Sequence, residues 1–320
     1  MKGQKMKIGN LNINCGEKKQ GFVSVYKTGL QIPITVICGI EKGDTILLTS
    51  GIHCAEYVGI EAALELAQKM TPDELKGQVI IIHPVNISGF EQCNYNSKVP
   101  EDHKNLNRVF PGSQDGTVSE QIADFLVKEF QSKADYYIDM HGGNTQDNLA
   151  PYVYYVAAAK PEVMEKARKM ACRVNVNYMV GSTVSSQGSY NYAGTSGIPS
   201  ILIERGCAGV WSLEEVELYK NDIKNVMRYL GILKDQEEEK EYQPVSVKQV
   251  EYLKSNHTGC WYPAKKAGDI VKRGELAGEI KDYFGNMLEQ FYFQDTGVIL
   301  YQTCTLCTYK GEEIVVYGKI

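Results

Sequence analysis

Residues 79–82 read Val-Ile-Ile-Ile and offer no polar side chain to either face of a strand. Because strand side chains alternate between the two faces, such a run is stable only where both faces of a sheet are covered. Residues 45–48 form a similar run, and apolar residues then recur at helical spacing, at Ile60, Ala63, Leu64, Ala67 and Met70. The pattern predicts an α/β protein whose central strands are buried between helices.

Composition and charge narrow the classes of protein. The chain has 320 residues, 43% of them hydrophobic and 23% charged, which is enough for one full core and a smaller module. A net charge of -5 without a basic cluster argues against nucleic-acid binding. No apolar run approaches a membrane span and the polar start lacks the core of a signal peptide, so we expect a cytoplasmic protein with no membrane partner. Nine cysteines, an odd number, favour reduced thiols over a disulfide framework.

The charged segment at residues 235–241 is the best domain boundary in the chain, and we predict domains at residues 1–240 and 241–320. Beyond it, strand-like runs alternate with glycine turns, and a loose internal repeat starts at Thr258 and again at Thr296. Two similar β halves resemble the barrel-sandwich fold of lipoyl and biotinyl carrier domains. Lys281 is nearest to the position of the modified lysine in those carriers, but its neighbours differ from theirs, so we expect no modification.

Residues 49–59 combine a strand end, a turn and a helix start. The apolar strand stops, the chain turns at Gly51, and the helix opens with His53 and Glu56 close together. Open α/β sheets expose reactive groups at such carboxyl ends of strands. An imidazole and a carboxylate at this spacing can both reach one zinc ion, although two such residues alone favour a simple polar turn over a metal site.

A second strand, within residues 135–143, ends in Asp139 and His141. The strand period of two places both side chains on the same face. His141 is therefore a candidate third metal ligand, and Asp139 is a candidate to hydrogen-bond a ligating histidine and orient its ring. His83 also follows a strand, but Pro84 stiffens the turn there, and we expect a structural histidine.

Residues 91–116 form a long polar loop, of a length that is usually functional or disordered. Its informative part is Asn107 and Arg108, because a guanidinium can hold a carboxylate with two hydrogen bonds or stabilise an oxyanion. A surface arginine without a role is the alternative.

Residues 181–197 are rich in Ser, Gly, Tyr and Asn, contain no lysine or arginine, and are expected to form a loop. The loop leads into an apolar strand that ends in Glu204. Glu204 is either a salt-bridge partner of Arg205 or a general base. The next helix has the pattern of a capping box, Ser212 with Glu215.

Four motifs occur in one order along the chain: Gly51-x-His53-x-x-Glu56, Asn105-Leu106-Asn107-Arg108-x-Phe110-Pro111-Gly112, Asp139-x-His141 and Glu204-x-Gly206. In this order they resemble the succinylglutamate desuccinylase and aspartoacylase family, a branch of the zinc carboxypeptidase fold. The resemblance spans most of the chain, and the β-rich second domain is also similar. It implies a mixed, mostly parallel sheet flanked by helices, followed by a small all-β barrel-sandwich domain.

The resemblance also implies roles for single residues. His53, Glu56 and His141 would bind one zinc ion per chain, with an open position for a water whose pKa is lowered to about 7. Glu204 would act as general base and then as general acid. Asn107 and Arg108 would hold the substrate's carboxylate or polarise its acyl oxygen, and Arg108 together with the metal would stabilise the charge of the tetrahedral intermediate. The chain is thus expected to be a zinc-dependent amidohydrolase that removes an acyl group from a small N-acylated amino acid or related amine.

Two departures from the family pattern concern the substrate. The family carries a further arginine before the Leu-Asn-Arg motif, where residues 97–104 here offer only lysines. It carries another shortly before the catalytic glutamate, where residues 189–195 contain no arginine. The second absence weakens the expectation of a dicarboxylate substrate. Tyr190, and with it Tyr192, instead contacts an aromatic or neutral group of the substrate, or merely packs in the core.

Two alternatives remain open at the level of the sequence. A metallocarboxypeptidase on the same scaffold would use Arg108 to bind the C-terminal carboxylate of a peptide. A non-catalytic binding protein would use the β-rich domain as its interaction surface. The sequence leaves open a homo-oligomer, the identity of the acyl group and the amine, and the use of another divalent metal.

Overall fold

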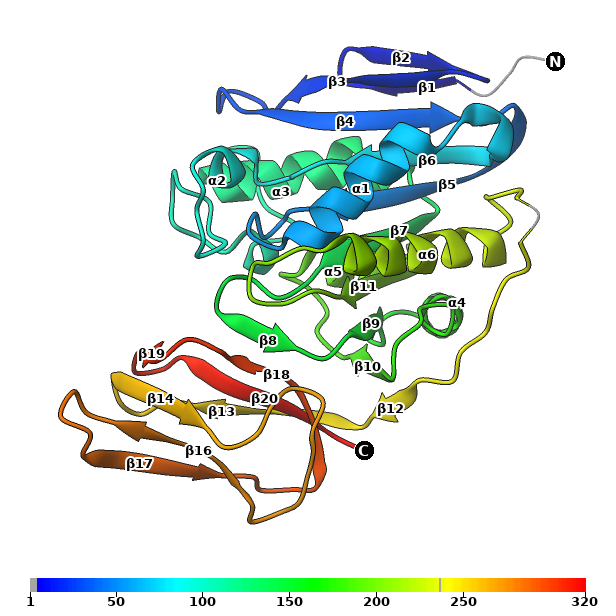
Figure 1. Ribbon diagram of the computed structural model, residues 1–320. Coiled ribbons are helices and arrows are strands. Elements are labelled where there is room, and N and C mark those ends of the chain that lie inside the picture. Colours follow the sequence, from blue (N-terminus) through cyan, green and yellow to red (C-terminus); the bar gives the residue numbers. More distant parts are fainter. Residues whose placement is uncertain (1–4, 236) are drawn as a thin grey trace.

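The computed structural model describes residues 5–235 and 237–320 and is organised around one large sheet (Figure 1). This nine-stranded sheet contains, in spatial order, β12 (Val245–Val247), β10 (Tyr178–Ser182), β9 (Tyr152–Val156), β11 (Ser200–Glu204), β7 (Tyr136–His141), β5 (Glu41–Ser50), β6 (Lys76–Ile82), β4 (Gln31–Cys38) and β3 (Lys18–Ser24). Five of its eight strand pairings are parallel: β12 with β10, β10 with β9, and the three that join β11, β7, β5 and β6. The predicted mixed, mostly parallel sheet is confirmed.

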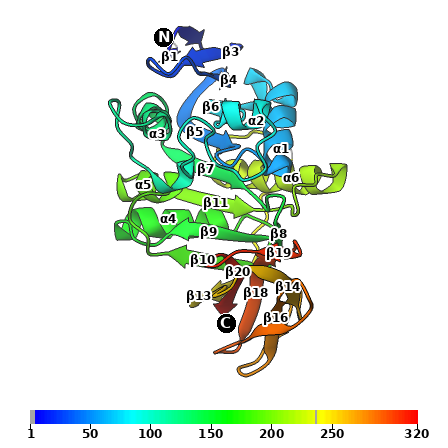
Figure 2. The ribbon, with the colours of Figure 1, turned by 90° about the vertical axis from the view of Figure 1, so that its left-hand side faces the viewer.

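Helices cover both faces of this sheet. The helices α1 (Tyr57–Lys69), α4 (Pro161–Ala171) and α6 (Leu213–Tyr229) pack on one face, and α3 (Val118–Glu129) and α5 (Ser189–Thr195) pack on the other. Figure 2 shows α1 and α6 on one side of the strands and α3 on the other. The hairpin of β1 (Lys5–Ile8) and β2 (Leu11–Asn14) adds Ile8 and Ile13 to the second core. Short helical turns fill connections: α2 (Ile87–Glu91), η1 (Pro72–Glu74), η2 (Leu106–Arg108) and η3 (Gln131–Lys133).

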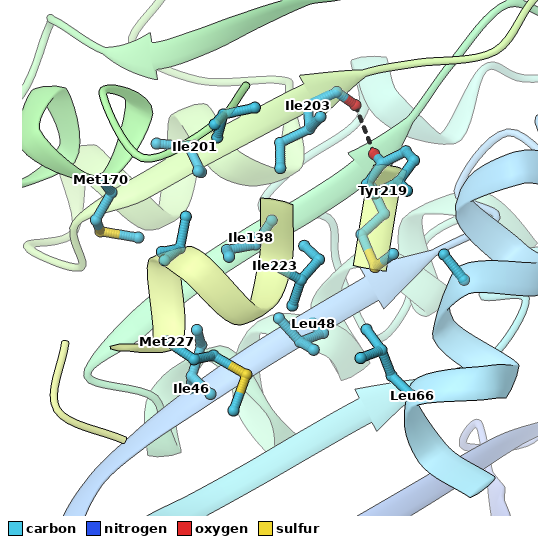
Figure 3. Close-up of a cluster of buried hydrophobic side chains, with 14 of the residues drawn as sticks. Ile46, Leu48, Leu66, Ile138, Met170, Ile201, Ile203, Tyr219, Ile223 and Met227 are labelled. Carbon is cyan, nitrogen blue, oxygen red and sulfur yellow. Dashed lines mark hydrogen bonds between the residues drawn. The ribbon is translucent and has the colours of Figure 1, made fainter. Parts of the chain in front are cut away.

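The apolar runs supply both cores because successive strand residues point to opposite faces. In β5, Ile46 and Leu48 belong to the core under α1 and α6, whereas Leu47 belongs to the core under α3. Figure 3 shows the first core, in which strand residues meet side chains of α1, α4 and α6, including Leu66, Met170, Ile223 and Met227. The prediction that these strands are buried on both faces is confirmed.

The C-terminal β module, β13 to β20, consists of two small sheets. One contains β13 (Gln249–Lys254), β20 (Glu313–Lys319), β18 (Gly297–Thr303) and β15 (Ile270–Val271), and β8 (Asp147–Leu149) pairs with its β18. The other contains β17 (Met287–Tyr292), β16 (Leu276–Lys281), β14 (Gly259–Pro263) and β19 (Cys307–Thr308). Trp261, Phe293 and Tyr317 are buried between them. The predicted division at residue 240 stays a prediction, and β12 extends the large sheet before the chain enters the module.

Two local predictions were wrong in part. Residues 181–197 are not all loop, because α5 forms within them. Its residues are poor helix formers, and tertiary contacts stabilise it: Gln131 donates a hydrogen bond to the Ser189 hydroxyl at 3.2 Å, and Tyr190 and Ala193 are buried. At α6, Ser212 accepts the Glu215 backbone N–H at 3.2 Å, but the Glu215 side chain lies 3.7 Å from Arg205, so only half of the capping box forms.

Two further findings bear on the composition arguments. The nine cysteines all lie in the described part of the chain, and none of them forms a disulfide. Among the helices that the structure describes, none is long and apolar enough to cross a membrane.

Candidate active site

Three neighbouring parallel strands, β5, β7 and β11, bring the candidate residues to one edge of the large sheet. His141 and Glu204 are the last residues of β7 and β11 and are paired in register. His53 and Glu56 follow the end of β5, in the turn before α1. Gly51 makes this turn with φ of +66°, and a Cβ atom there would lie 2.8 Å from the backbone of Pro84, so a side chain cannot be accommodated.

His53, Glu56 and His141 form a compact cluster. Glu56 lies between the two histidines: its Oε1 is 2.7 Å from His53 Nδ1, and its Oε2 is 2.9 Å from His141 Nδ1. The Gly142 backbone N–H also donates to Glu56 Oε2 at 3.1 Å. One potential ligand atom from each of the three residues lies within 4.8 Å of the others. The three side chains can therefore bind a single metal ion.

The far nitrogen of each imidazole faces a further polar group. His141 Nε2 lies 3.3 Å from Asp139 Oδ2, and neither atom has a hydrogen-bond partner among the described residues. Asp139 is itself oriented by Thr49, whose hydroxyl donates to Asp139 Oδ1 at 2.7 Å. His53 Nε2 is 3.0 Å from Asn105 Oδ1. Both rings thus present Nδ1 to Glu56. Asp139 lies beside the other nitrogen of His141, the position from which it could orient that ring.

The charges in the cluster suit a cation. Burial disfavours the Glu56 anion, but His53 and His141 lower the pKa of Glu56 to about 2. Burial also opposes protonation of His141, but Asp139 and Glu56 together raise its pKa well above the usual value. The cluster therefore holds a carboxylate that requires a positive charge beside it. Two imidazole nitrogens and one carboxylate oxygen are a donor set that zinc prefers, so these residues fit the metal.

Glu204 is not the partner of Arg205. The Arg205 side chain turns away and forms a buried ion pair with Asp222 at 2.8 Å. Glu204 instead lines a cavity with the cluster, and burial together with the nearby charge of Glu56 raises its pKa well above the ordinary value for a carboxyl group. Of the two roles that the sequence left open for Glu204, the salt bridge to Arg205 is excluded.

The cavity has a volume of about 390 Å³ and brings together most of the residues that the sequence singled out for the site, whereas Asp139 and Tyr192 are absent from its described lining. Its lining includes His53, Glu56, Asn107, Arg108, His141, Tyr190 and Glu204. Asn107 is buried in η2, and its side-chain oxygen accepts the Ser189 backbone N–H at 2.8 Å. The exposed Arg108 side chain donates to the Asn107 carbonyl at 2.8 Å and remains available to a ligand in the cavity.

A family model, the succinylglutamate desuccinylase/aspartoacylase catalytic domain, matches residues 42–230. The chain belongs to this family. N-alpha-acetyl-L-2,4-diaminobutyric acid deacetylase of Halomonas elongata is 26% identical over 307 residues, covering 91% of this chain and 86% of that protein.

Two solved structures share the fold over at least 98% of this chain. The product-bound ectoine utilization protein EutE (DoeB) of Ruegeria pomeroyi has a TM-score of 0.88, with 24% identity over 100% of this chain and 99% of that chain. A succinylglutamate desuccinylase/aspartoacylase of Rhodobacter sphaeroides has a TM-score of 0.83, with 25% identity over 98% of this chain and 99% of that one.

The structure shows which residues occupy the two positions where this desuccinylase/aspartoacylase family member lacks an arginine of the family pattern. Lys98 and Lys104 occupy the segment where the family carries an arginine, yet neither lines the cavity, and Lys104 pairs with Glu120 at 3.2 Å. At the second position, Tyr190 is buried, its ring centroid lies 6.2 Å from that of Tyr154, and it lines the cavity. Tyr192 is absent from the described lining and packs against the core.

His83 lies outside the described cavity lining. Its Nε2 is 2.8 Å from the Thr35 hydroxyl, and burial lowers the pKa of its imidazole to about 4. A histidine with this pKa is neutral at physiological pH, as a structural histidine in a packed sheet should be.

One side of the cavity was not predicted from the sequence. This β-module side consists of Asp147, Tyr252, Tyr301 and Glu313, which come from β8, β13, β18 and β20. Asp147 lies in a three-residue strand without an apolar pattern, and the other three lie far along the chain in the predicted second domain. Their arrival at the cavity depends on the pairing of β8 with β18.

Proposed function

We propose that this chain is a zinc-dependent deacylase that hydrolyses the amide bond of a small N-acylated amino acid. The observation that carries the proposal is the convergence of His53, Glu56, His141 and Glu204 at one sheet edge, in a cavity of about 390 Å³. The similarity to the Halomonas elongata deacetylase, whose name specifies an N-acetylated amino acid, supports the same type of reaction.

The metal site consists of His53, Glu56 and His141, with Asp139 behind His141 to orient its ring. When bound there, zinc supplies Lewis-acid chemistry: it acidifies a water and polarises the acyl carbonyl.

Glu204 acts as the general base. Its carboxylate accepts a proton from the attacking water and later returns that proton to the leaving amine, which must be protonated to depart. Burial and Glu56 hold its pKa high, and a high pKa favours a group that takes up and releases one proton within a catalytic cycle.

Arg108 and Asn107 bind the substrate. The exposed guanidinium of Arg108 is suited to the free carboxylate of an N-acyl amino acid. Asn107 holds this guanidinium in place, because the Asn107 backbone carbonyl accepts a hydrogen bond from Arg108. Tyr190 forms part of the wall beside the substrate. The cavity volume lies in the range typical of small-ligand sites, which favours a single acylated amino acid over a peptide.

Because none of the nine cysteines of the chain forms a disulfide, we place the reaction in the cytoplasm.

The test measures release of primary amine from N-acetyl amino acids, N-succinyl amino acids and short peptides. Zinc-loaded protein is compared with protein treated with a chelator and with chelated protein to which zinc is returned. We expect chelator-sensitive cleavage of acylated single amino acids, restored by zinc. Cleavage confined to peptides would assign a carboxypeptidase instead, and turnover that survives complete removal of metal would contradict the zinc mechanism.

A further inference from the structure

Two cysteines of the β module lie directly opposite each other on neighbouring strands. Cys260 belongs to β14 and Cys307 to β19, and the antiparallel register of these strands pairs the two residues. Figure 1 shows β14 and β19 side by side at the left of the module. Side chains of directly opposite residues extend from the same face of a sheet, so the two thiols share one face.

The hydrogen bonds beside this pair define its geometry. The next opposite residues are Trp261 and Leu306, and the Trp261 backbone N–H donates to the Leu306 carbonyl at 2.7 Å. Hydrogen-bonded and non-hydrogen-bonded pairs alternate along an antiparallel ladder, so Cys260 and Cys307 form a non-hydrogen-bonded pair. The Cα atoms of such a pair lie about 4.5 Å apart. This separation is within the range of about 4.4–6.8 Å that disulfides span.

Both thiols face away from the core of the β module. The residue that follows each cysteine, Trp261 or Thr308, is buried. Because strand side chains alternate between the two faces, the cysteines themselves point to the outer face. Cys307 is exposed and Cys260 is partly exposed, so small reagents in solution can reach the pair.

Cys304 lies only two residues before the start of β19 but has different surroundings. Its Sγ is 4.0 Å from the Thr145 carbonyl oxygen, and its backbone N–H donates to the Gln146 carbonyl at 2.8 Å. Burial also raises the pKa of the Cys304 thiol. The thiolate is the reactive form of cysteine, so Cys304 is a poor competitor for Cys307. The partner of Cys307 is therefore Cys260, the residue across the ladder.

We infer that Cys260 and Cys307 form a thiol-modification site that reacts with low-molecular-mass disulfides such as oxidised glutathione. The product is a cross-strand disulfide that ties β19 to β14. It closes the long chain segment between the two cysteines into a loop, which restricts the unfolded chain and stabilises the protein. Neither cysteine belongs to the described lining of the cavity, so the inference is independent of the proposed deacylase function.

The reaction is a two-step thiol–disulfide exchange. The Cys307 thiolate attacks one sulfur of oxidised glutathione, which breaks the S–S bond, forms a mixed disulfide and releases one reduced glutathione. The Cys260 thiolate then attacks the Cys307 sulfur of the mixed disulfide and releases the second reduced glutathione. The two cysteines lose two protons and two electrons, and oxidised glutathione takes up both. Because exposed disulfides are readily reduced, an excess of reduced glutathione should reverse the reaction.

The experiment treats the reduced, full-length protein with oxidised glutathione, blocks the remaining thiols with iodoacetamide and maps the disulfides by mass spectrometry. We expect the Cys260 peptide to be linked to the Cys307 peptide in most molecules, and reduced glutathione in excess to separate them. Cys93 is exposed and lies outside the strands that the structure describes, so it is the internal control. It should form only a mixed disulfide with glutathione.

Cys260→Ser and Cys307→Ser should each abolish the link, whereas the matched control Cys304→Ser should retain it. Cys260→Ser should accumulate the mixed disulfide at Cys307, because the second step lacks its nucleophile. Oxidised wild-type protein should unfold several degrees above the reduced protein, and Cys260→Ser should show no such difference.

A link between Cys304 and Cys307, or a wild-type protein that stops at the mixed disulfide, would overturn the inference. A linked protein that unfolds at the same temperature as the reduced one would contradict the stabilising effect. The disulfide map of the wild type decides the pairing even if a variant does not fold.

Discussion

The two sides of the cavity have different origins. The strand-end side, His53, Glu56, His141 and Glu204, comes from the carboxyl ends of three neighbouring parallel strands. The β-module side, Asp147, Tyr252, Tyr301 and Glu313, comes from a three-residue strand and from three strands near the end of the chain. The strand-end side belongs to the large sheet itself. The β-module side instead depends on the contact between β8 and β18.

This difference indicates that the two sides of the cavity have different functions. Groups at strand ends are held by a buried sheet with helices on both faces, so they can be positioned closely enough for metal binding and proton transfer. The β-module side comes from strands that lie outside the large sheet, so we expect its residues to select the substrate. Variants on the strand-end side should therefore affect the rate of every substrate, whereas variants on the β-module side should affect which substrate is used.

The largest effect is expected for Glu204→Gln, which keeps the shape of the side chain but removes the base. We expect kcat to fall by about 100- to 10,000-fold for all substrates, the usual contribution of a general base. Zinc content should not change, because Glu204 is not one of the three ligands. The same substitution at Glu313 on the β-module side is the matched control. Full activity of zinc-loaded Glu204→Gln would remove Glu204 from its proposed role.

A smaller effect is expected for Asp139→Asn, which alters the group behind the His141 ring. Loss of such an orienting carboxylate should weaken zinc binding by about 10- to 100-fold. Competition against a chelating dye measures this affinity directly. Asp115→Asn, on an exposed loop, is the control and should bind zinc as the wild type does. If both variants bind zinc equally well, Asp139 only packs against the histidine.

The smallest effect is expected for Tyr252→Phe on the β-module side. Tyr252 and Arg108 both line the cavity, so loss of the Tyr252 hydroxyl should weaken the binding of a substrate whose carboxylate is held by Arg108. We expect KM to rise by about two- to tenfold with little change in kcat, the range of one neutral hydrogen bond. Tyr283→Phe, at an exposed turn of the β module, is the control. A loss of kcat as large as that of Glu204→Gln would show that the β-module side also takes part in catalysis.

Most of the fold could be predicted from the sequence because the relevant signals are local. The runs at 45–48 and 79–82 identify strands that are buried on both faces, and both are interior strands of the large sheet. The helix α5 was missed because its residues have low helix propensity and its stability comes from contacts such as that between Gln131 and Ser189. Local sequence cannot report a contact between segments so far apart.

The distinction between local signals and long-range contacts also explains which parts of the site could be predicted. The sequence by itself determined the residue types at the strand ends, because a strand and the polar residue that ends it are contiguous in the chain. Only the tertiary structure decided that Arg205 pairs with Asp222 and leaves Glu204 to the cavity, and that Asp147 faces the same cavity. Both outcomes depend on strand pairing and helix packing between distant residues. Periodicity encodes which face of an element is buried, but it does not encode which distant element covers that face.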